Sequence, residues 1–264
     1  MKITHILPHS IEIYGLTPSK FTRYDAYIHK YAKMSKELGY ESYVMYLSSS
    51  IDYPLQQIHK YGHIAIAYPV TFNKLVPRRR RFGYEVSVPL IRDLVMTDID
   101  IIHVHSYYLF MYDVIAMIIK RVGNRKIVAH YHGGDPSMLL YPFRIFKKIT
   151  LPLADRIIAI NKSEFRRLIK YWKIPQDKVV YIPNGVDTNF FRLLSNVRKS
   201  DNVVLFVGNL VKDKGVDVLL KAFIKCKKKV KDLKLVIVGD GPMRQSLEKV
   251  VKLMKLSDDV KFLG

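Results

Sequence analysis

The stretch VVLFVGNLVKDKGVDVLLKAF, residues 203–223, decides the fold of this chain. Its first five residues are apolar and mostly β-branched or aromatic, which is typical of a buried strand. Gly208 and Gly215 then enclose a polar loop, and from Gly215 the apolar residues recur at helical spacing up to Val230. A strand that passes through a glycine loop into a helix predicts a βαβ unit on a parallel sheet.

The residues after this stretch complete one such unit. We expect a strand over residues 233–238, a helix over 242–255 and a strand over 260–263. The resulting βαβαβ order is one mononucleotide-binding half, whereas a doubly wound domain normally has two halves. The sequence therefore predicts that residues 203–264 form the first half of a nucleotide-binding domain.

The same alternation of short β-branched runs and amphipathic segments fills residues 1–190, so the predicted class is α/β throughout. Expected strands cover residues 3–7, 41–47, 63–67, 101–105, 126–131, 156–160 and 179–182. Expected helices cover residues 21–38, 107–121, 139–154 and 163–171. In the helix over 21–38, the apolar and aromatic residues are spaced for one buried face ended by Gly39, namely Tyr24, Tyr27, Ile28, Tyr31, Ala32 and Leu38. Residues 191–202 lose this periodicity and are expected to form a linker.

The composition excludes several classes of protein. With 49% hydrophobic and 25% charged residues in 264, the chain folds, and its single cysteine excludes a disulfide framework or a cysteine zinc site. The apolar stretch at the start of the sequence is shorter than that of a signal peptide. No segment of the sequence approaches the roughly 20 consecutive apolar residues of a membrane span. The expected location is cytoplasmic, with association at the inner membrane face as a further expectation.

The net charge of +21 indicates an anionic partner. Four consecutive arginines occupy residues 78–81, and we expect this run either to touch an anionic membrane surface or to form a solvated loop. The lysines among residues 225–231 are expected to be a solvated face at the end of a helix. No nucleic-acid-binding module accompanies the charge, so nucleic acid is not the expected partner.

Histidines follow two neighbouring expected strands, and they raise the question of a metal site. The candidate ligands are His103, His105, His130, His132, Asp100 and Asp135. Alternate residues of a strand share a face, so only some of these side chains can reach a common point, and we expect no metal. Instead, His103 and His130 are expected to pack inside the sheet, while His105 and His132 face a ligand. Asp135 is expected to cap the next turn or to orient a sugar hydroxyl.

Glycine loops supply the expected phosphate contacts. Lys214 immediately precedes a helix, where an ammonium group and free backbone N–H groups point at one anion. Gly239 and Gly241 allow close approach of a ligand after the next strand. In the first domain only Gly15 is available near a helix start, and the absence of G-x-G-x-x-G after the first strand disfavours a dehydrogenase.

Taken in order, these motifs resemble the GT-B glycosyltransferases of family 4. The matching motifs are H-x-H at 103–105, H-G-G-D at 132–135, I-P-N-G-V-D at 182–187, V-G-x-L-x-x-x-K-G-V-D at 207–217 and V-G-D-G-P at 238–242. The resemblance implies two Rossmann-like domains across a cleft, with the acceptor on the amino-terminal one and the nucleotide-sugar on the other. It also implies transfer of a hexose-type sugar with retention, without a metal or other cofactor, to a lipid-linked, polysaccharide or other glycan acceptor.

The resemblance also implies roles for particular residues. His132 would contact the donor hexose and Lys214 would bind its diphosphate, which makes these two the expected catalytic residues. Gly15 would abut the same phosphate. Asn209 stands where the family usually has arginine, and losing such a charge-assisted contact costs about 1.5–3 kcal/mol. His105 and Asp135 would contact the sugar or the acceptor.

The family continues beyond the motifs found here with an E-x7-E segment that holds the donor. One expectation is that a partner chain supplies this segment to a split enzyme. The alternative is a truncated, non-catalytic remnant that acts in binding, and it predicts an exposed apolar edge at residues 260–263.

Overall fold

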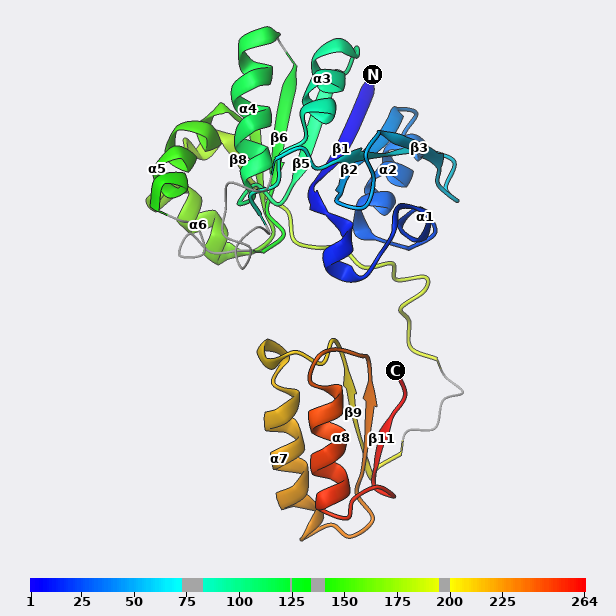
Figure 1. Cartoon of the computed structure of the whole chain (residues 1–264). Coiled ribbons are helices and arrows are strands. Elements are labelled where there is room, and N and C mark those ends of the chain that lie inside the picture. The colour runs from blue at the N-terminus through cyan, green and yellow to red at the C-terminus, as the bar shows by residue number, and fades with distance from the viewer. Residues whose placement is uncertain (73–82, 124, 134–140, 195–199) are drawn as a thin grey trace. The chain divides into compact units, whose positions relative to one another are not determined.

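The computed structural model describes residues 1–72, 83–123, 125–133, 141–194 and 200–264, the side chain of Tyr141 excepted. It divides into two compact units, Met1–Val186 and Asp187–Gly264 (Figure 1). We describe each unit by itself. The arginine run at 78–81 and Asp135 lie outside the described residues, so their expected roles stay predictions.

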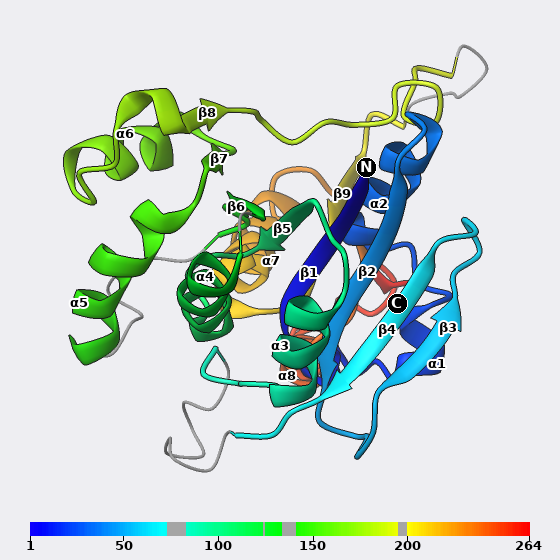
Figure 2. The same ribbon diagram turned by 90° about the horizontal axis from the view of Figure 1, so that it is seen from above.

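Unit 1 (Met1–Val186) is built on an eight-stranded sheet in the order β3-β4-β2-β1-β5-β6-β7-β8 (Figure 2). The strands are β1 (Lys2–Ser10), β2 (Glu41–Ser48), β3 (Leu55–Ile58), β4 (Ile64–Pro69), β5 (Ile101–His105), β6 (Lys126–His130), β7 (Arg156–Ala159) and β8 (Val179–Tyr181). All neighbours are parallel except β3, which runs antiparallel to β4. The chain order reverses between β1 and β5, and ligands of such sheets bind beyond the strand ends at this reversal.

The helices of unit 1 follow the predicted order with two differences. They are α1 (Pro18–Phe21), α2 (Tyr27–Glu37), α3 (Val88–Met96), α4 (Phe110–Val122), α5 (Tyr141–Thr150) and α6 (Lys162–Lys170). The helix predicted over 21–38 is wrong in its first turn, because the Thr22 hydroxyl donates to the carbonyls of Pro18 and Ser19 and helps to close α1 as a single turn. Ile28 and Ala32 are buried as predicted.

Other parts of that prediction also need correction. Tyr24 and Leu38 are exposed, since Tyr24 lies between α1 and α2 and Leu38 caps the end of α2. Gly39 follows with φ +85°, as expected of a residue that stops a helix. The sequence pattern did not predict β3, whose LQQI segment is polar at its centre, or α3, which begins with a Ser87 side chain accepting from the amide of Leu90.

The two faces of the unit 1 sheet differ in chemistry. One face is apolar along β1, β5 and β6, where Ile6, Ile102 and Ile127 belong to a core that includes residues of α3 and α4. The other face is apolar only over β1, β2 and β4, beneath α1 and α2. Over β5 and β6 this second face carries histidines, because they alternate with the apolar residues, and the ring of Tyr31 from α2 packs against them.

Unit 2 (Asp187–Gly264) is the predicted βαβαβ half. Its elements are β9 (Val203–Val207), α7 (Val216–Lys227), β10 (Lys234–Val238), α8 (Arg244–Leu253) and β11 (Val260–Phe262), with a parallel sheet in the order β11-β10-β9. Helices α7 and α8 cover one face of this sheet (Figure 1). Among the described helices, none is long and apolar enough to span a membrane.

Strand β9 of unit 2 has apolar side chains that no other described element covers. Val203, Leu205 and Val207 are 41%, 61% and 70% exposed, so one side of this strand faces solvent along its whole length. The expectation of an exposed edge at residues 260–263 is wrong in part, because Val260 is buried against the helices while Leu263 is exposed.

Candidate functional site

The loops that follow β9 and β10 are joined through their backbones. The amide of Gly208 donates to the carbonyl of Val238 at 3.0 Å, and the amide of Leu210 donates to the carbonyl of Asp240 at 2.9 Å. The carbonyl of Leu210 in turn accepts from the amide of Met243 at 3.0 Å. Since both strands are parallel, these loops lie at the same edge of the sheet. They form a hydrogen-bonded backbone surface at the carboxyl ends of the strands.

This joining requires glycine at two positions. A Cβ at Gly239 would lie 2.1 Å from the carbonyl oxygen of Gly208, and a Cβ at Gly241 would lie 2.7 Å from that of Leu210. Their φ angles of +131° and +157° also fall where other residues are strained. The two glycines predicted to admit a ligand are therefore also needed for the contact between the loops.

Lys214 and Asn209 belong to the first of these loops. Lys214 ends a 3-10 turn (Lys212–Lys214), and Gly215, with φ +67°, carries the chain directly into α7. Both side chains are exposed, and Lys214 forms no ion pair with any residue that the structure describes. The first backbone N–H groups of α7 have no helical partner, so this end of unit 2 has the charge and the donors to hold an anion.

His132 stands just beyond β6 in unit 1 and is half-buried. Its Nε2 lies 2.8 Å from Nδ1 of His105, and its ring stacks on Tyr27 with centroids 4.4 Å apart. Gly133 follows with φ +113°. Burial, and then the neighbouring His130, lower the pKa of His132 to about 3. The ring is therefore neutral at pH 7 and can exchange hydrogen bonds with a hydroxyl group.

His105 does not face a ligand in this structure. It is fully buried behind His132, because it lies on β5 beneath Tyr31 of α2. This corrects the expectation that His105 faces a ligand: its side chain is enclosed, and its Nδ1 lies 2.8 Å from Nε2 of His132. His103 and His130 are buried as predicted, with His103 Nε2 at 3.1 Å from His130 Nδ1.

Gly15 lies beyond the carboxyl end of β1, after a 3-10 turn (Ile11–Tyr14), with φ +70° and open space around it. The helix that follows, α1, is a single turn, so it offers a phosphate a weaker dipole than the long helix that was predicted. The phosphate role of Gly15 stays a prediction.

Three residues near these strand ends could not be found from sequence patterns. Glu85 is buried, and its Oε2 accepts from the amide of Ser10 at 3.1 Å, at the end of β1. Burial raises the pKa of Glu85. Ser106, directly after β5, has φ +67°, a strained value for a residue other than glycine. No motif surrounds Glu85 or Ser106, and Tyr27 was expected in a buried helical face rather than against His132.

Family models match nearly the whole chain. The model of glycosyltransferase family 4 matches residues 25–190, and that of the group 1 glycosyl transferases matches residues 188–264. The chain belongs to glycosyltransferase family 4. Members of these families transfer sugars from nucleotide-sugars to lipid or glycan acceptors.

Relatives of the family 4 chain share 29–30% identity over parts of their length. An N-acetylgalactosaminyltransferase of Campylobacter jejuni that acts on a diphospho-undecaprenol acceptor is 30% identical over 57% of this chain and 43% of its own. The N-acetyl-alpha-D-glucosaminyl L-malate synthase of Bacillus anthracis is 30% identical over 63% and 46%. A GDP-mannose-dependent phosphatidylinositol monomannoside mannosyltransferase of Mycolicibacterium smegmatis is 29% identical over 54% and 40%. The matched part is less than half of each of these relatives.

Solved structures confirm the predicted fold class. Sucrose-phosphate synthase from Thermosynechococcus elongatus has a TM-score of 0.68 at 17% identity, and all of this chain matches 70% of it. HepE of Anabaena, in complex with UDP and glucose, has a TM-score of 0.64 at 17% identity, with 100% and 69% covered. The family 4 chain thus has a GT-B fold, with two Rossmann-like units of which the second contains a three-stranded sheet.

Proposed function

We propose that this chain is part of an enzyme that transfers a hexose-type sugar from a nucleotide-sugar to a lipid-linked or other glycan acceptor. The observation that carries the proposal is the joined pair of glycine loops in unit 2, with Lys214 exposed at the start of α7. Such a surface offers a diphosphate both backbone donors and a positive charge. Family membership supports the same substrate class.

Lys214 neutralises charge on the diphosphate as the bond from phosphate to sugar lengthens. Positive groups held in place before reaction stabilise such a leaving group without reorganisation. Asn209 stands near it in the same loop and is uncharged, so binding depends more strongly on Lys214 than it would with an arginine at this position. We propose no metal or other cofactor for the transfer.

His132 hydrogen-bonds a hydroxyl of the donor sugar, and His105 sets the orientation of its ring. The 2.8 Å contact between the two rings and the stacking on Tyr27 support this role, because both restrict rotation of the imidazole. We propose retention of configuration at the sugar on family grounds.

The acceptor carries phosphate or lies at an anionic membrane surface on the cytoplasmic side. The net charge of +21 supports this proposal, as do relatives named for diphospho-undecaprenol and phosphatidylinositol monomannoside. Nucleic acid is not proposed as a partner.

Further protein completes the donor site. We propose that it brings the E-x7-E segment and adds to β9, whether it belongs to the same protein or to a partner chain. The exposed side of β9 supports this arrangement, since apolar strand residues are rarely left in water.

Calorimetric titration of the chain with UDP, GDP and ADP tests the diphosphate site. We expect one of them to bind, and Lys214→Ala to weaken it at least 10-fold, because the substitution removes the only charge proposed to face the diphosphate. The matched control is Lys221→Ala, which removes an exposed lysine from α7. Equal weakening by both variants would show a general charge effect and refute the role of Lys214.

A further inference from the structure

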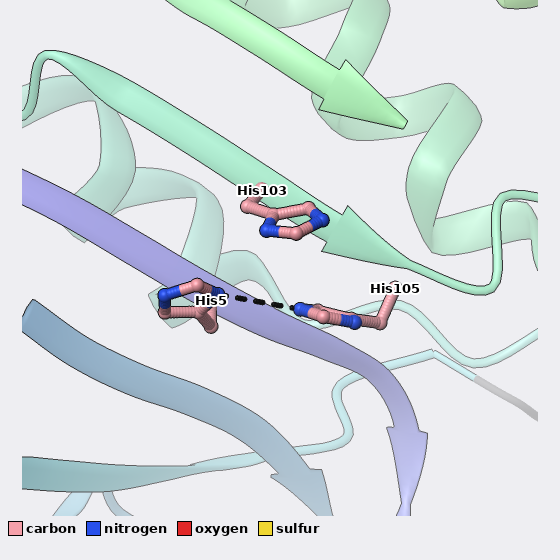
Figure 3. A group of neighbouring side chains, drawn as sticks. All are labelled: His5, His103 and His105. Atoms are coloured by element: carbon pink, nitrogen blue, oxygen red, sulfur yellow. Dashed lines mark hydrogen bonds between the residues drawn. The ribbon is translucent and has the colours of Figure 1, made fainter. Parts of the chain in front are cut away.

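Three histidine rings meet on the sheet face beneath α2, within unit 1. His5 comes from β1, and His103 and His105 come from the paired strand β5 (Figure 3). Ring centroids lie 5.1 Å apart for His5 and His103, 5.6 Å for His5 and His105, and 4.2 Å for His103 and His105. One nitrogen of each ring lies within 4.8 Å of those of the other two.

The nitrogens that converge can be identified. Nδ1 of His5 lies 3.4 Å from Nε2 of His105. Two ligands of a tetrahedral ion with metal–nitrogen bonds of about 2.0–2.1 Å are about 3.3–3.4 Å apart, so this spacing fits a shared ion. Nε2 of His103 lies 3.1 Å from His130 Nδ1, and Figure 3 shows the other ring nitrogen of His103 on the side of the ring that faces His5.

The opposite nitrogen of each ring has a polar partner outside the group. His5 Nε2 lies 3.2 Å from Ser35 Oγ, and His103 Nε2 lies 3.1 Å from His130 Nδ1. His105 Nδ1 lies 2.8 Å from His132 Nε2. If each outer nitrogen donates its proton to that partner, all three inner nitrogens present lone pairs to one another. Metal-binding histidines show this division, with one nitrogen on the ion and the other donating to a neighbouring group.

Burial makes this arrangement costly without a cation. His5, His103 and His105 are 2%, 8% and 0% exposed, so inward lone pairs have little access to water. A proton between His5 and His105 would satisfy only one contact, at the long distance of 3.4 Å. No described residue hydrogen-bonds Nδ1 of His103. A divalent ion would satisfy all three nitrogens at once.

A second group of buried histidines, His29, His59 and His63, shows what a cluster without this division looks like. Its rings stack nearly parallel, with interplanar angles of 14–25°. His59 Nδ1 accepts from the amide of Tyr61 at 3.2 Å, so its proton is on Nε2, which faces the carbonyl of Tyr24 at 3.4 Å. Neither nitrogen of His59 is left for a metal.

We propose that His5, His103 and His105 bind one transition-metal ion of the kind that imidazole prefers, with Zn²⁺ as the first candidate. Three protein ligands leave one coordination position for water or another ligand. The ion would connect β1 to β5 and keep the proton of His105 on Nδ1, which donates a hydrogen bond to Nε2 of His132. Because Nε2 of His132 then accepts, the proton of His132 is on its own Nδ1. This role is one of positioning and stability, and it does not depend on the proposed transfer reaction.

The test uses the chain without a polyhistidine tag, stripped with a chelator and titrated with Co²⁺, whose visible spectrum reports four- or five-coordinate nitrogen sites. We expect one ion per chain, displaced by Zn²⁺, and loss of the visible bands in His103→Gln and His105→Gln. The matched control is His63→Gln in the stacked group, which keeps the bands. Absence of Co²⁺ binding by the wild-type chain, or equal loss in His63→Gln, would overturn the proposal.

Two measurements on the wild-type chain remain decisive if the variants do not fold. Zn²⁺ should raise the unfolding temperature read from the fluorescence of Trp172, the single tryptophan, which is buried in unit 1. X-ray absorption of the Zn²⁺-loaded chain should show three imidazole nitrogens at about 2.0–2.1 Å. Fewer than three imidazoles, or no thermal shift, contradicts the site. Neither readout involves a nucleotide-sugar, so failure here leaves the proposed function standing.

Discussion

The candidate sites of the two units are built from different parts of the polypeptide, side chains in unit 1 and mainly backbone in unit 2. Unit 1 contains all nine histidines, several of them gathered on one sheet face, and its candidate site is made of side chains. Unit 2 contains no histidine, and its candidate site is made of glycine backbone with Lys214. Unit 1 should therefore respond to protons and metals, whereas unit 2 should respond to small changes in backbone shape.

The chain offers separate probes for testing this difference. Trp172 is buried in unit 1, and the single cysteine, Cys226, is exposed in unit 2. Tryptophan fluorescence and a dye on the cysteine thus report unfolding of the two units in the same molecule.

The largest expected effect is that of Gly239→Ala on unit 2. The added Cβ would lie 2.1 Å from the carbonyl of Gly208, so the two loops must separate, at a cost of at least about 4 kcal/mol. Denaturant unfolding read from the Cys226 dye should show unit 2 unfolded or nearly so, with the Trp172 transition unchanged. Gly215→Ala is the control, because its φ of +67° is strained but its Cβ meets nothing, and about 1–2 kcal/mol is expected. Equal losses in the two variants would mean that loop contact is unimportant.

Next in size is Asp113→Ala, which acts on unit 1 alone. Asp113 of α4 pairs with Lys147 of α5 at 2.7 Å, and both side chains are almost fully buried. Removing the carboxylate leaves the ammonium group buried without its partner, which should cost about 3–5 kcal/mol in the Trp172 transition. Glu37→Gln, at an exposed ion pair with Lys33, should cost no more than about 0.5 kcal/mol. A small effect of Asp113→Ala would show that Lys147 loses its proton or finds another partner.

Lowering the pH should reduce the stability of unit 1 but not that of unit 2, and the effect should be smaller than those of the two substitutions above. Burial, and then the neighbouring histidines, lower the pKa of His29 to about 3 and of His63 to about 4; the charges of Asp25, Lys36 and Lys60 also act on this cluster. Between about pH 4 and 6.5 the unfolded chain binds more protons at these rings than the folded chain does. The stability of unit 1 therefore falls as pH drops below 6.5, by up to about 1.4 kcal/mol per pH unit for each ring that stays neutral.

Unit 2 should keep its stability over that range. Hydrogen bonds from Lys227 and then Lys234 lower the pKa of Asp259, so its contribution is lost only as pH falls below about 3.8. Denaturation curves at pH 7, 6 and 5 should thus shift for Trp172 and stay fixed for the Cys226 dye. Parallel shifts of the two probes would contradict the contrast.

Ser35→Ala should have the smallest effect. It removes the partner of His5 Nε2 while keeping all three proposed metal ligands. Loss of such an outer hydrogen bond typically weakens metal affinity 10–100-fold, and we expect the low end, about 10-fold for Co²⁺, since Ser35 is half-buried. The stability of unit 1 without metal should change by less than about 1 kcal/mol. Unchanged affinity would show that His5 is oriented by packing alone.

The bounds of an element could be predicted closely where particular residues mark its end. β9 and β5 have the predicted bounds, because glycines or histidines mark the strand ends. The break between α1 and α2 could not be predicted, since helical spacing of apolar residues continues across it and the stop comes from a hydroxyl bond to the backbone. β3 pairs with β4 through its backbone, which its polar side chains do not reveal.

The two candidate sites also differ in how far they could be predicted from the sequence. Lys214 and the glycines of unit 2 are local in sequence, so a motif finds them. The histidine group of unit 1 is not local: His5 pairs with residues about a hundred positions later, and only the register of β1 on β5 brings them together. The expectation of no metal rests on the spacing within the two later strands, where His103, His105, His130 and His132 lie, and that spacing carries no information about His5.

The exposed side of β9 has a practical consequence for handling the chain. An open strand bearing Leu205 and Val207 is a template on which another strand can pair, and mutual repulsion from a net charge of +21 opposes that encounter. Added salt shortens the range of this repulsion, from about 30 Å at 0.01 M to about 8 Å at 0.15 M ionic strength. Solubility should therefore decline as salt rises, and purification in dilute buffer should keep the molecules apart.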